Sequence, residues 1–271
     1  MEFKDIGLTV TGACNTEREE MRRNVLMNQC WPRVRYMSPY FPPCAVVGGG
    51  PSVKDNLNLL RDWPGDIFAI NETAAYLSDH GIKSYLYMID CHPVQVRAGI
   101  HIKGAILATQ CNPSQFIYSN IRVFDMVDDS IGGVEGGPSA ACRAPHLFLR
   151  MGYEKIYFFG CDSSFFDTTH ITGDTSEMKE NLLIIRVNGI DYITNIVFML
   201  QLEQLVLMFK KHPQFLFNAS GGLLKAVLEH DKYEVVGISE DLRNKYPDRG
   251  GEIRFPTPYK FNRETTWQPG V

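Results

Sequence analysis

The segment from Cys44 to Val53 joins a short apolar run to three consecutive glycines, a proline and a serine. The apolar residues predict a buried strand, and residues 53–61 predict a helix that follows it directly. Glycine lets the backbone approach a ligand closely, and a helix N-terminus capped by Ser52 favours an anionic group. The segment therefore predicts a phosphate-binding turn at the end of a first strand. Its residues are Gly48, Gly49, Gly50 and Ser52.

The turn carries neither of the two common phosphate-binding fingerprints. G-x-G-x-x-G and G-x-x-x-x-G-K-[ST] are both interrupted by Pro51 and Ser52. A glycine-rich connection between a strand and a helix, with no ligand, fits the same residues. The segment by itself leaves both interpretations open.

Short apolar runs alternate with helix-like runs through most of the chain that follows. This alternation predicts an α/β fold with a Rossmann-like parallel sheet flanked by helices, which binds ligands at the carboxyl ends of its strands. Pro145 is expected to kink one helix or to delay its start. The predicted strands are 45–47, 67–70, 84–89, 105–109, 123–126, 156–159 and 215–217, and the predicted helices are 53–61, 72–79, 139–151 and 193–211.

Three parts are expected along the chain. Residues 1–43 form an N-terminal helical and extended appendage, in which Thr16 caps a helix over about 17–29. Residues 44–238 form the Rossmann-like nucleotide-binding catalytic domain. Residues 239–271 form an irregular C-terminal tail rich in proline, arginine and aromatic residues.

Composition narrows the functional classes. The 271 residues are 44% hydrophobic and carry a net charge of −4. The sequence contains no long basic stretch, so non-specific electrostatic binding of nucleic acid is not indicated. The seven cysteines are widely spaced without a CxxC pair, which indicates neither a zinc site nor a disulfide framework. No signal-peptide pattern is evident and the apolar runs are shorter than a membrane span. A cytoplasmic protein without a membrane span is expected, and whether it forms a homo-oligomer stays open.

Polar residues follow two of the central predicted strands. The amide of Asn71 is able to read a base or a sugar hydroxyl, or the residue caps the next helix. The carboxylate of Asp90 suits a metal, a ribose or a reacting hydroxyl, and His92 suits acid–base chemistry. The alternative for both is an Asx-turn before Pro93.

Two further segments are candidates. The stretch from Gly132 to Ser139 resembles the first turn in composition, so Gly137 and Ser139 are candidates for nucleotide binding, or Ser139 merely caps a helix. Asp162 follows another strand, and His170 lies in the polar loop after it. These two residues form a candidate catalytic pair, although a loop histidine is more often an exposed bystander. Residues 218–222 are either a third polar rim segment or a turn.

Several of these motifs together resemble the MptE-like family, which includes archaeal 6-hydroxymethylpterin diphosphokinases and motility accessory factors. Their order is also similar to that of bacterial lipooligosaccharide sialyltransferases. The resemblance spans roughly residues 44–229. It rests on Gly48–Val53, Asn71, Asp90, Met151–Asp162, His170 and Phe217–Gly222.

The resemblance implies a Rossmann-like domain of the GT-A-like sialyltransferase architecture, with a nucleotide at the glycine turn. Contacts with that nucleotide are implied for Gly48, Gly50, Ser52 and Asn71. Asp90 and Asp162 would lie near the transferred group, and His170 would be the acid or base.

The leading hypothesis is a glycosyltransferase that moves a sugar from a CMP- or UDP-linked donor to an acceptor hydroxyl of a glycan, a protein or a modified nucleobase. A second is an ATP-dependent diphosphokinase acting on a pterin-like alcohol, with Mg²⁺ held by Asp90 or Asp162. A third is a nucleotide-binding factor without catalytic activity. Fold analogy alone does not separate these.

Overall fold

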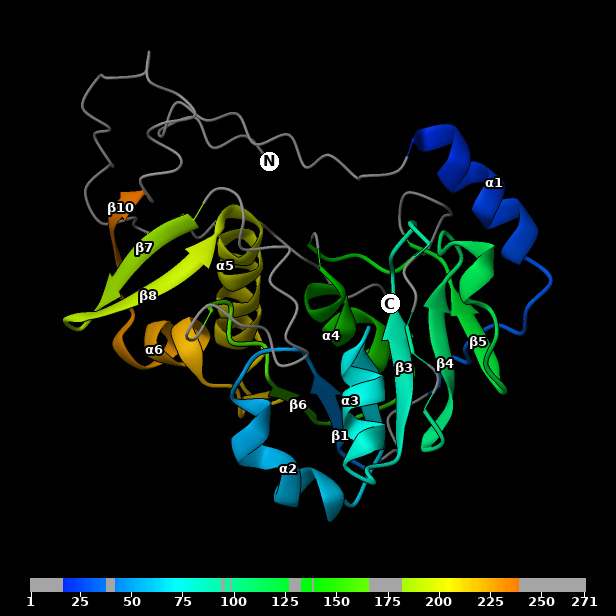
Figure 1. Ribbon diagram of the computed structural model, residues 1–271, viewed down its shortest axis with the longest axis horizontal. Helices are drawn as coiled ribbons and strands as arrows, with labels where there is room; N and C mark the ends of the chain where they lie inside the picture. The colour runs from blue at the N-terminus through cyan, green and yellow to red at the C-terminus, as the bar shows by residue number, and fades with distance from the viewer. Residues whose placement is uncertain are drawn as a thin grey trace.

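A seven-stranded parallel sheet forms the centre of the molecule (Figure 1). The computed structural model describes residues 17–37, 42–93, 96–97, 99–126, 133–137, 139–165 and 182–238. All six strand pairings of this sheet are parallel, which confirms the predicted α/β, Rossmann-like architecture. The strands are β1 (Cys44–Val47), β2 (Ile67–Ile70), β3 (Ser84–Met88), β4 (Ile102–Ala108), β5 (Ile121–Phe124), β6 (Ile156–Phe159) and β9 (Leu216–Asn218).

The strand order is β5-β4-β3-β2-β1-β6-β9. From β1 the chain builds outward through β2 to β5, then returns to the other side of β1 to form β6. The topological switch point therefore lies between β1 and β6, which is where sheets of this kind bind ligands. Every residue of β1 is fully buried, as expected for a strand covered on both faces.

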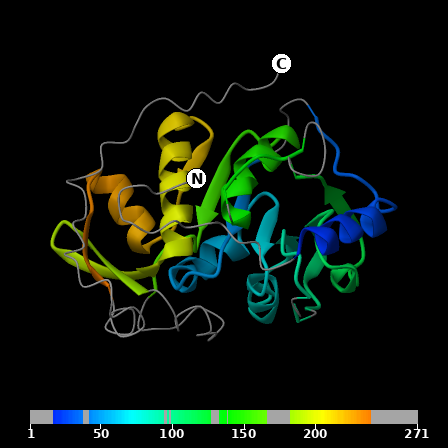
Figure 2. The same ribbon diagram turned by 90° about the horizontal axis from the view of Figure 1, so that it is seen from above.

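Helices cover both faces of the sheet. Figure 2 shows α2 (Val53–Arg61) and α3 (Thr73–Asp79) on one side and α4 (Ala140–Arg150) on the other. Right-handed crossovers require this arrangement, because α4 carries the chain back across the sheet. Phe148 of α4 stacks on Phe68 of β2 at 4.0 Å between ring centroids and meets Tyr87 of β3 at 5.2 Å. Two further helices are α5 (Ile196–Lys211) and α6 (Gly222–His230).

Helix α1 (Arg18–Asn28) lies at the carboxyl ends of the strands, at the upper right of Figure 1. Its only buried residues are Asn24 and Asn28. Asn28 Nδ2 donates to the carbonyls of Thr109 and Cys111 at 2.9 and 2.7 Å, and Asn24 Nδ2 reaches the carbonyl of Gln110 at 3.2 Å. The helix is therefore attached through buried amides rather than through an apolar stripe.

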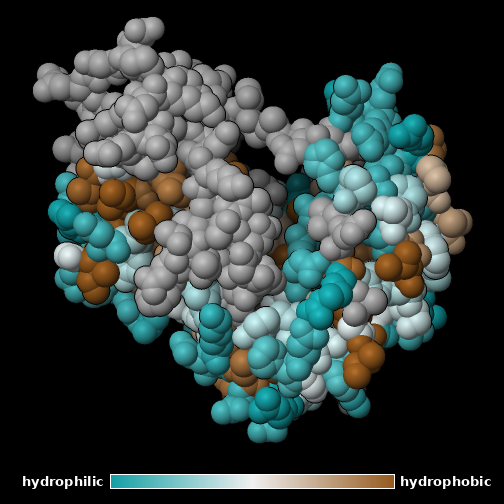
Figure 3. Space-filling view, viewed as in Figure 1, coloured by the Kyte–Doolittle hydropathy of each residue, from teal (hydrophilic) through white to brown (hydrophobic). Residues whose placement is uncertain are grey.

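A second, antiparallel sheet was not predicted from the sequence. It consists of β7 (Leu182–Val187), β8 (Ile190–Asn195) and β10 (Glu234–Ile238) in the order β10-β7-β8. Asn188 and Gly189 join β7 to β8 with φ of 48° and 80°, the left-handed conformations that a two-residue hairpin turn requires. Hydrophobic side chains gather over β7 and β8 in Figure 3. The exposed hydrophobic residues of this region are Ile190, Ile193, Val197 and Val236.

Several boundaries differ from the prediction. The helix expected at 193–211 begins only at Ile196, because residues 190–195 pair with β7 and the Asn195 side chain accepts the N–H of Phe198 at 2.8 Å. Helix α4 begins at Ala140 and contains Pro145, so the proline does not delay its start. A short 3-10 turn, η1 (Pro113–Gln115), was also missed. Helix α1 has Glu17 as its N-cap residue, and Thr16 lies outside the described residues.

Among the described residues, no helix has both the length and the apolar character needed to cross a membrane. Within the same part of the chain, Cys44, Cys91, Cys111, Cys142 and Cys161 are buried, and Cys30 is exposed.

Candidate functional site

The glycine turn after β1 packs against the turn after β6. Gly48 N donates to Phe159 O at 2.8 Å, and Gly50 N donates to Gly160 O at 2.7 Å. A Cβ atom on Gly48 would lie 2.6 Å from Gly160 O, which no real side chain tolerates. The glycines are therefore required by the close approach of two backbones at the switch point.

Asp162 occupies the position in which a phosphate was expected. Ser52 N donates to Asp162 Oδ2 at 2.9 Å, and Ser52 Oγ lies 2.5 Å from Asp162 Oδ1. Gly221 N, from the turn after β9, lies 3.1 Å from the same Oδ1 atom and 3.0 Å from Ser52 Oγ. One carboxylate thus connects the turns after β1, β6 and β9. The predicted cap on α2 is not formed by the Ser52 side chain, because its hydroxyl is used here.

Burial raises the pKa of Asp162, and the hydrogen bonds from Ser52 and Gly221 oppose that shift. The side chain is 2% exposed. A phosphate that used the Ser52 amide would have to displace this carboxylate. Asp162 therefore stabilises the turns at the switch point through its hydrogen bonds with Ser52 and Gly221.

Asn71 and Asp90 meet at the carboxyl ends of β2 and β3. Asn71 Nδ2 donates to Asp90 Oδ2 at 2.7 Å. Asn71 has φ of 51°, a left-handed conformation that asparagine adopts more readily than most residues, and its Oδ1 is buried without a hydrogen-bond partner. Its side chain does not cap α3, whose N-cap residue is Glu72.

The pKa of the Asp90 carboxyl is raised mainly by burial. The hydrogen bond from Asn71 and the charge of the nearby His92 both lower it. His92 is itself exposed. A carboxylate that is buried but reachable at a strand end is a stronger base than a solvated one, which suits proton abstraction from a hydroxyl.

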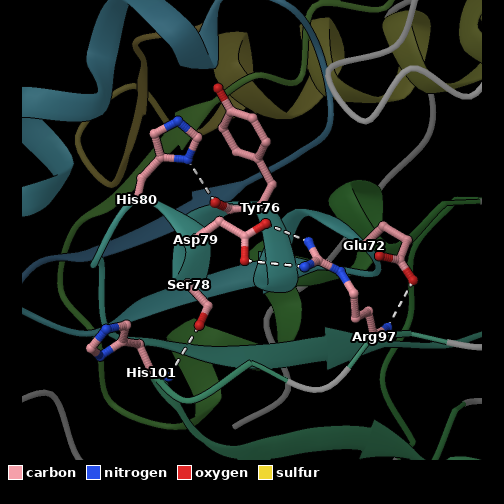
Figure 4. Close-up of polar contacts among 7 residues, drawn as sticks. All are labelled: Glu72, Tyr76, Ser78, Asp79, His80, Arg97 and His101. Carbon is pink, nitrogen blue, oxygen red and sulfur yellow. Dashed lines mark hydrogen bonds and ion pairs between the residues drawn. The ribbon is translucent and has the colours of Figure 1, made fainter.

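Residues that follow Asp90 are hydrogen-bonded to α3 and to Glu72, which precedes it (Figure 4). Arg97 N donates to Glu72 Oε1 at 3.0 Å, and the Arg97 guanidinium forms a bidentate ion pair with Asp79. His101 N donates to Ser78 Oγ at 3.1 Å. Glu72 directly follows Asn71, so these contacts hold the turn after β3 against the helix that Asn71 precedes.

The second glycine-containing stretch leads into α4. Ser139 Oγ accepts the N–H of Cys142 at 3.3 Å, so the capping interpretation of Ser139 is confirmed. A Cβ on Gly137 would lie 3.0 Å from Gln204 Cγ, which places this residue against α5. The carbonyls of Gly133 and Val134 accept hydrogen bonds from Arg150 and Arg143 of α4, at 3.1 and 2.9 Å.

Two grooves lie on either side of α6. The first, of about 420 Å³, borders the switch point, and the second, of about 370 Å³, borders the hairpin of β7 and β8. Both include Gly221, Lys225 and Glu229. The first is lined by Ser52, Asp55, Asn56, Asn218, Ala219, Ser220, Gly221, Lys225, Leu228 and Glu229. Residues 218–222 are therefore a polar rim segment as well as a turn.

The structure brings Asn71 to Asp90 and Ser52 to Asp162, but it keeps the two carboxylates apart. They follow β3 and β6, which are separated by two strands and hence by roughly 14 Å at the usual strand spacing. His170 lies outside the described residues. Among the residues that are described, no group of three or more His, Cys, Asp or Glu side chains is arranged to hold a metal ion.

Sequence reasoning missed Tyr87 and Arg143, both buried near the same edge of the sheet. Each stands in an apolar run that was assigned to the core by its pattern. Arg143 could have been found from the sequence, because it is a cation inside the apolar first half of a predicted helix, in Ala140-Ala141-Cys142-Arg143-Ala144. Comparisons of the chain with family models, with curated proteins and with solved structures found no match.

Proposed function

We propose that the protein is a glycosyltransferase that moves a sugar from a CMP- or UDP-linked donor to an acceptor hydroxyl. The observation that carries this proposal is the Asn71–Asp90 pair. It puts a partly buried carboxylate and an unpaired amide oxygen side by side at the carboxyl edge of a parallel sheet. That edge is where Rossmann-like domains bind nucleotides and carry out chemistry.

In this proposal Asp90 is the general base. The acceptor oxygen attacks the anomeric carbon of the sugar while the bond from that carbon to the donor phosphate oxygen breaks. The acceptor proton passes to the Asp90 carboxylate, and the nucleotide leaves with the bonding electron pair on its phosphate. Burial, which raises the pKa of Asp90, makes the carboxylate a better proton acceptor for this step.

Asn71 has two parts in the proposal. Its Nδ2–H holds Asp90 in place, and its unpaired Oδ1 is available to accept a hydrogen bond from the base or a sugar hydroxyl of the donor. The other nucleotide-binding candidates follow neighbouring strands of the same sheet. The resemblance to the MptE-like family and to sialyltransferases supports a nucleotide donor, and His170 is retained as a second acid–base candidate from that resemblance.

The diphosphokinase alternative has less support from the geometry. The two carboxylates expected to bind Mg²⁺ belong to separate hydrogen-bond networks, Asp90 with Asn71 and Asp162 with Ser52. Among the described residues, no further acidic side chain is hydrogen-bonded within either network.

A turnover assay tests the proposal. Purified protein is incubated with CMP- and UDP-linked sugars and a mixture of glycan acceptors, and released nucleotide is quantified. Release is expected with one donor class, and Asp90→Asn is expected to reduce it by roughly a hundred-fold or more, the usual contribution of a general base. Asp62→Asn is the control, because Asp62 is an exposed carboxyl at the far end of α2. Release that is unaffected by Asp90→Asn contradicts the assignment of the base.

A further inference from the structure

Arg143 is a buried cation. It lies in the first turn of α4 and is 9% exposed. Its Nη1 donates to Val134 O at 2.9 Å, and its Nε has no hydrogen-bond partner. Among the described residues, no acidic side chain forms an ion pair with it. A buried guanidinium is unfavourable unless an anion accompanies it, so the missing partner calls for an explanation.

A second unpaired donor belongs to a residue that packs against the same helix. Tyr87 is fully buried, and its hydroxyl has no hydrogen-bond partner. The positive charge of Arg143 acts on this hydroxyl and lowers its pKa, against the larger opposite effect of burial. The Tyr87 ring packs against Phe148 of the same helix, at 5.2 Å between ring centroids.

Tyr87 lies on β3, three residues before Asp90. Asn71 N donates to Tyr87 O at 3.2 Å, so Tyr87 lies directly beside the residue that holds the proposed base. Asn71 Oδ1, Tyr87 Oη and Arg143 Nε are all among the buried polar atoms without a hydrogen-bond partner.

The electrostatic surroundings favour an anion. The first turn of α4 contains no acidic side chain, and the amino end of this 11-residue helix carries the positive end of the helix dipole. Gly136 packs closely against Arg143, since a Cβ there would lie 2.7 Å from Arg143 Cγ. The amide cradle at Ser52, by contrast, is already filled by Asp162.

We propose that Arg143 and Tyr87 form a subsite, at the amino end of α4, for the phosphate oxygens of the nucleotide donor. The proposal rests on the proposed function, because it locates the phosphate of that donor. Arg143 Nε–H and the Tyr87 hydroxyl both donate to the phosphate, and the guanidinium supplies the counter-charge. In the glycosyl transfer described above, the same two groups stabilise the negative charge that remains on the leaving phosphate.

Two variants test the subsite. Tyr87→Phe keeps the ring that packs on Phe148 and removes only the unpaired hydroxyl. Arg143→Gln removes the charge but keeps a side-chain N–H that is able to serve Val134 O. Arg150→Gln is the matched control, because Arg150 lies on the same helix and donates to a carbonyl of the same segment.

The measurements are melting temperatures of the free proteins and dissociation constants for CMP, UDP, cytidine and uridine. In the wild type, one nucleotide is expected to bind at least about ten-fold more tightly than its nucleoside, as charge-assisted hydrogen bonds imply. Tyr87→Phe and Arg143→Gln are expected to remove most of that advantage, and Arg150→Gln to keep it. The melting temperature of free Tyr87→Phe should equal or exceed that of the wild type, because the lost hydroxyl had no partner.

Three results would overturn the subsite. If nucleotide and nucleoside bind equally well, the protein binds nucleosides but has no phosphate subsite, and the proposed function survives. If Tyr87→Phe lowers the melting temperature of the free protein while nucleotide affinity is unchanged, the two donors hold a structural water instead. If no nucleotide and no nucleoside binds, the proposed function fails together with the subsite.

Discussion

Ser52 and Asp162 are 110 positions apart in the chain and are joined by a 2.9 Å hydrogen bond from the Ser52 amide to a carboxylate oxygen. The bond crosses the switch point between β1 and β6, the place where a sheet of this topology has room for a ligand. The protein places its own carboxylate there. In the function proposed above, the ligand therefore binds further along the edge, at the ends of β2 and β3 and the start of α4.

Replacing Ser52 by alanine should destabilise the fold. The change removes the hydroxyl that bonds Asp162 Oδ1 and accepts from Gly221 N. Hydrogen bonds to charged groups contribute about 1.5–3 kcal/mol, so a loss in that range is expected in urea unfolding. The exposed Ser119 is the control, and Ser119→Ala should change stability by less than about 0.5 kcal/mol. Equal effects of the two substitutions would contradict the structural part given to Asp162.

Replacing Asn71 by glycine should move the pH dependence of turnover. Glycine tolerates the left-handed φ of 51°, so the change removes the side chain with little backbone strain. Asp90 then loses the hydrogen bond that lowers its pKa. Because a protonated Asp90 is inactive as a base, the acidic limb of kcat/KM against pH should shift to higher pH.

Asn120 provides the matched control for that experiment. It also has a left-handed φ, of 55°, and its side chain bonds a backbone carbonyl, but it lies at the amino end of β5. Asn120→Gly should leave the pH profile in place. A profile that is the same in the wild type and in Asn71→Gly would show that Asn71 does not tune the base.

Asn28→Ala should loosen helix α1. The substitution leaves the carbonyls of Thr109 and Cys111 without their donor, which costs about 1–3 kcal/mol when such groups stay buried. Amide hydrogen exchange across residues 18–28 should accelerate by roughly ten- to a hundred-fold. The exposed Asn58 of α2 serves as the control, and unchanged exchange in Asn28→Ala would show that α1 is held by other contacts.

His146 should make the fold sensitive to acid. Burial lowers the pKa of this histidine from 6.5 to about 4, so the folded state holds it neutral. The unfolded chain binds the proton more readily between these values. Its contribution to stability is complete above pH 6.5 and is lost as the pH falls towards 4, which amounts to about 2 kcal/mol between pH 7 and pH 5.

The measurement is urea unfolding of the wild type, His146→Gln and His230→Gln at both pH values. His230 is an exposed histidine at the end of α6. His146→Gln should lose about 2 kcal/mol less than the wild type on acidification, and His230→Gln should behave as the wild type does. If all three proteins lose the same stability, His146 is not held neutral in the fold.

The parallel sheet was predictable because buried parallel strands are short apolar runs with little ambiguity. Three of the predicted elements, at 53–61, 67–70 and 156–159, have the predicted bounds. The second sheet was not predictable, because β8 runs without a break into α5 and the apolar residues of β8 continue the helical spacing of α5. Strand β10 pairs with β7 across the whole of α5 and α6, a contact that no local pattern reveals.

The sequence predicted the candidate site only through the rule that parallel sheets bind ligands at the carboxyl ends of their strands. That rule identified Ser52, Asn71, Asp90 and Asp162, each as a separate residue after its own strand. Which of them meet depends on the order of the strands, and that order places β6 rather than β3 beside β1. Arg143 was missed because hydropathy assigns its segment to the core and does not register an unpaired charge.

The central proposal is that the edge of the sheet around Asn71, Asp90 and Arg143 binds a sugar nucleotide. A thermal-shift titration of the wild type and Asn71→Gly with CMP- and UDP-linked sugars, and with ATP, each with and without Mg²⁺, tests it directly. A donor at a hundred times its Kd stabilises the fold by about 2.7 kcal/mol, so a rise of several degrees without Mg²⁺, reduced in Asn71→Gly, is predicted. A rise with ATP and Mg²⁺ alone, or with none of these ligands, would contradict the account.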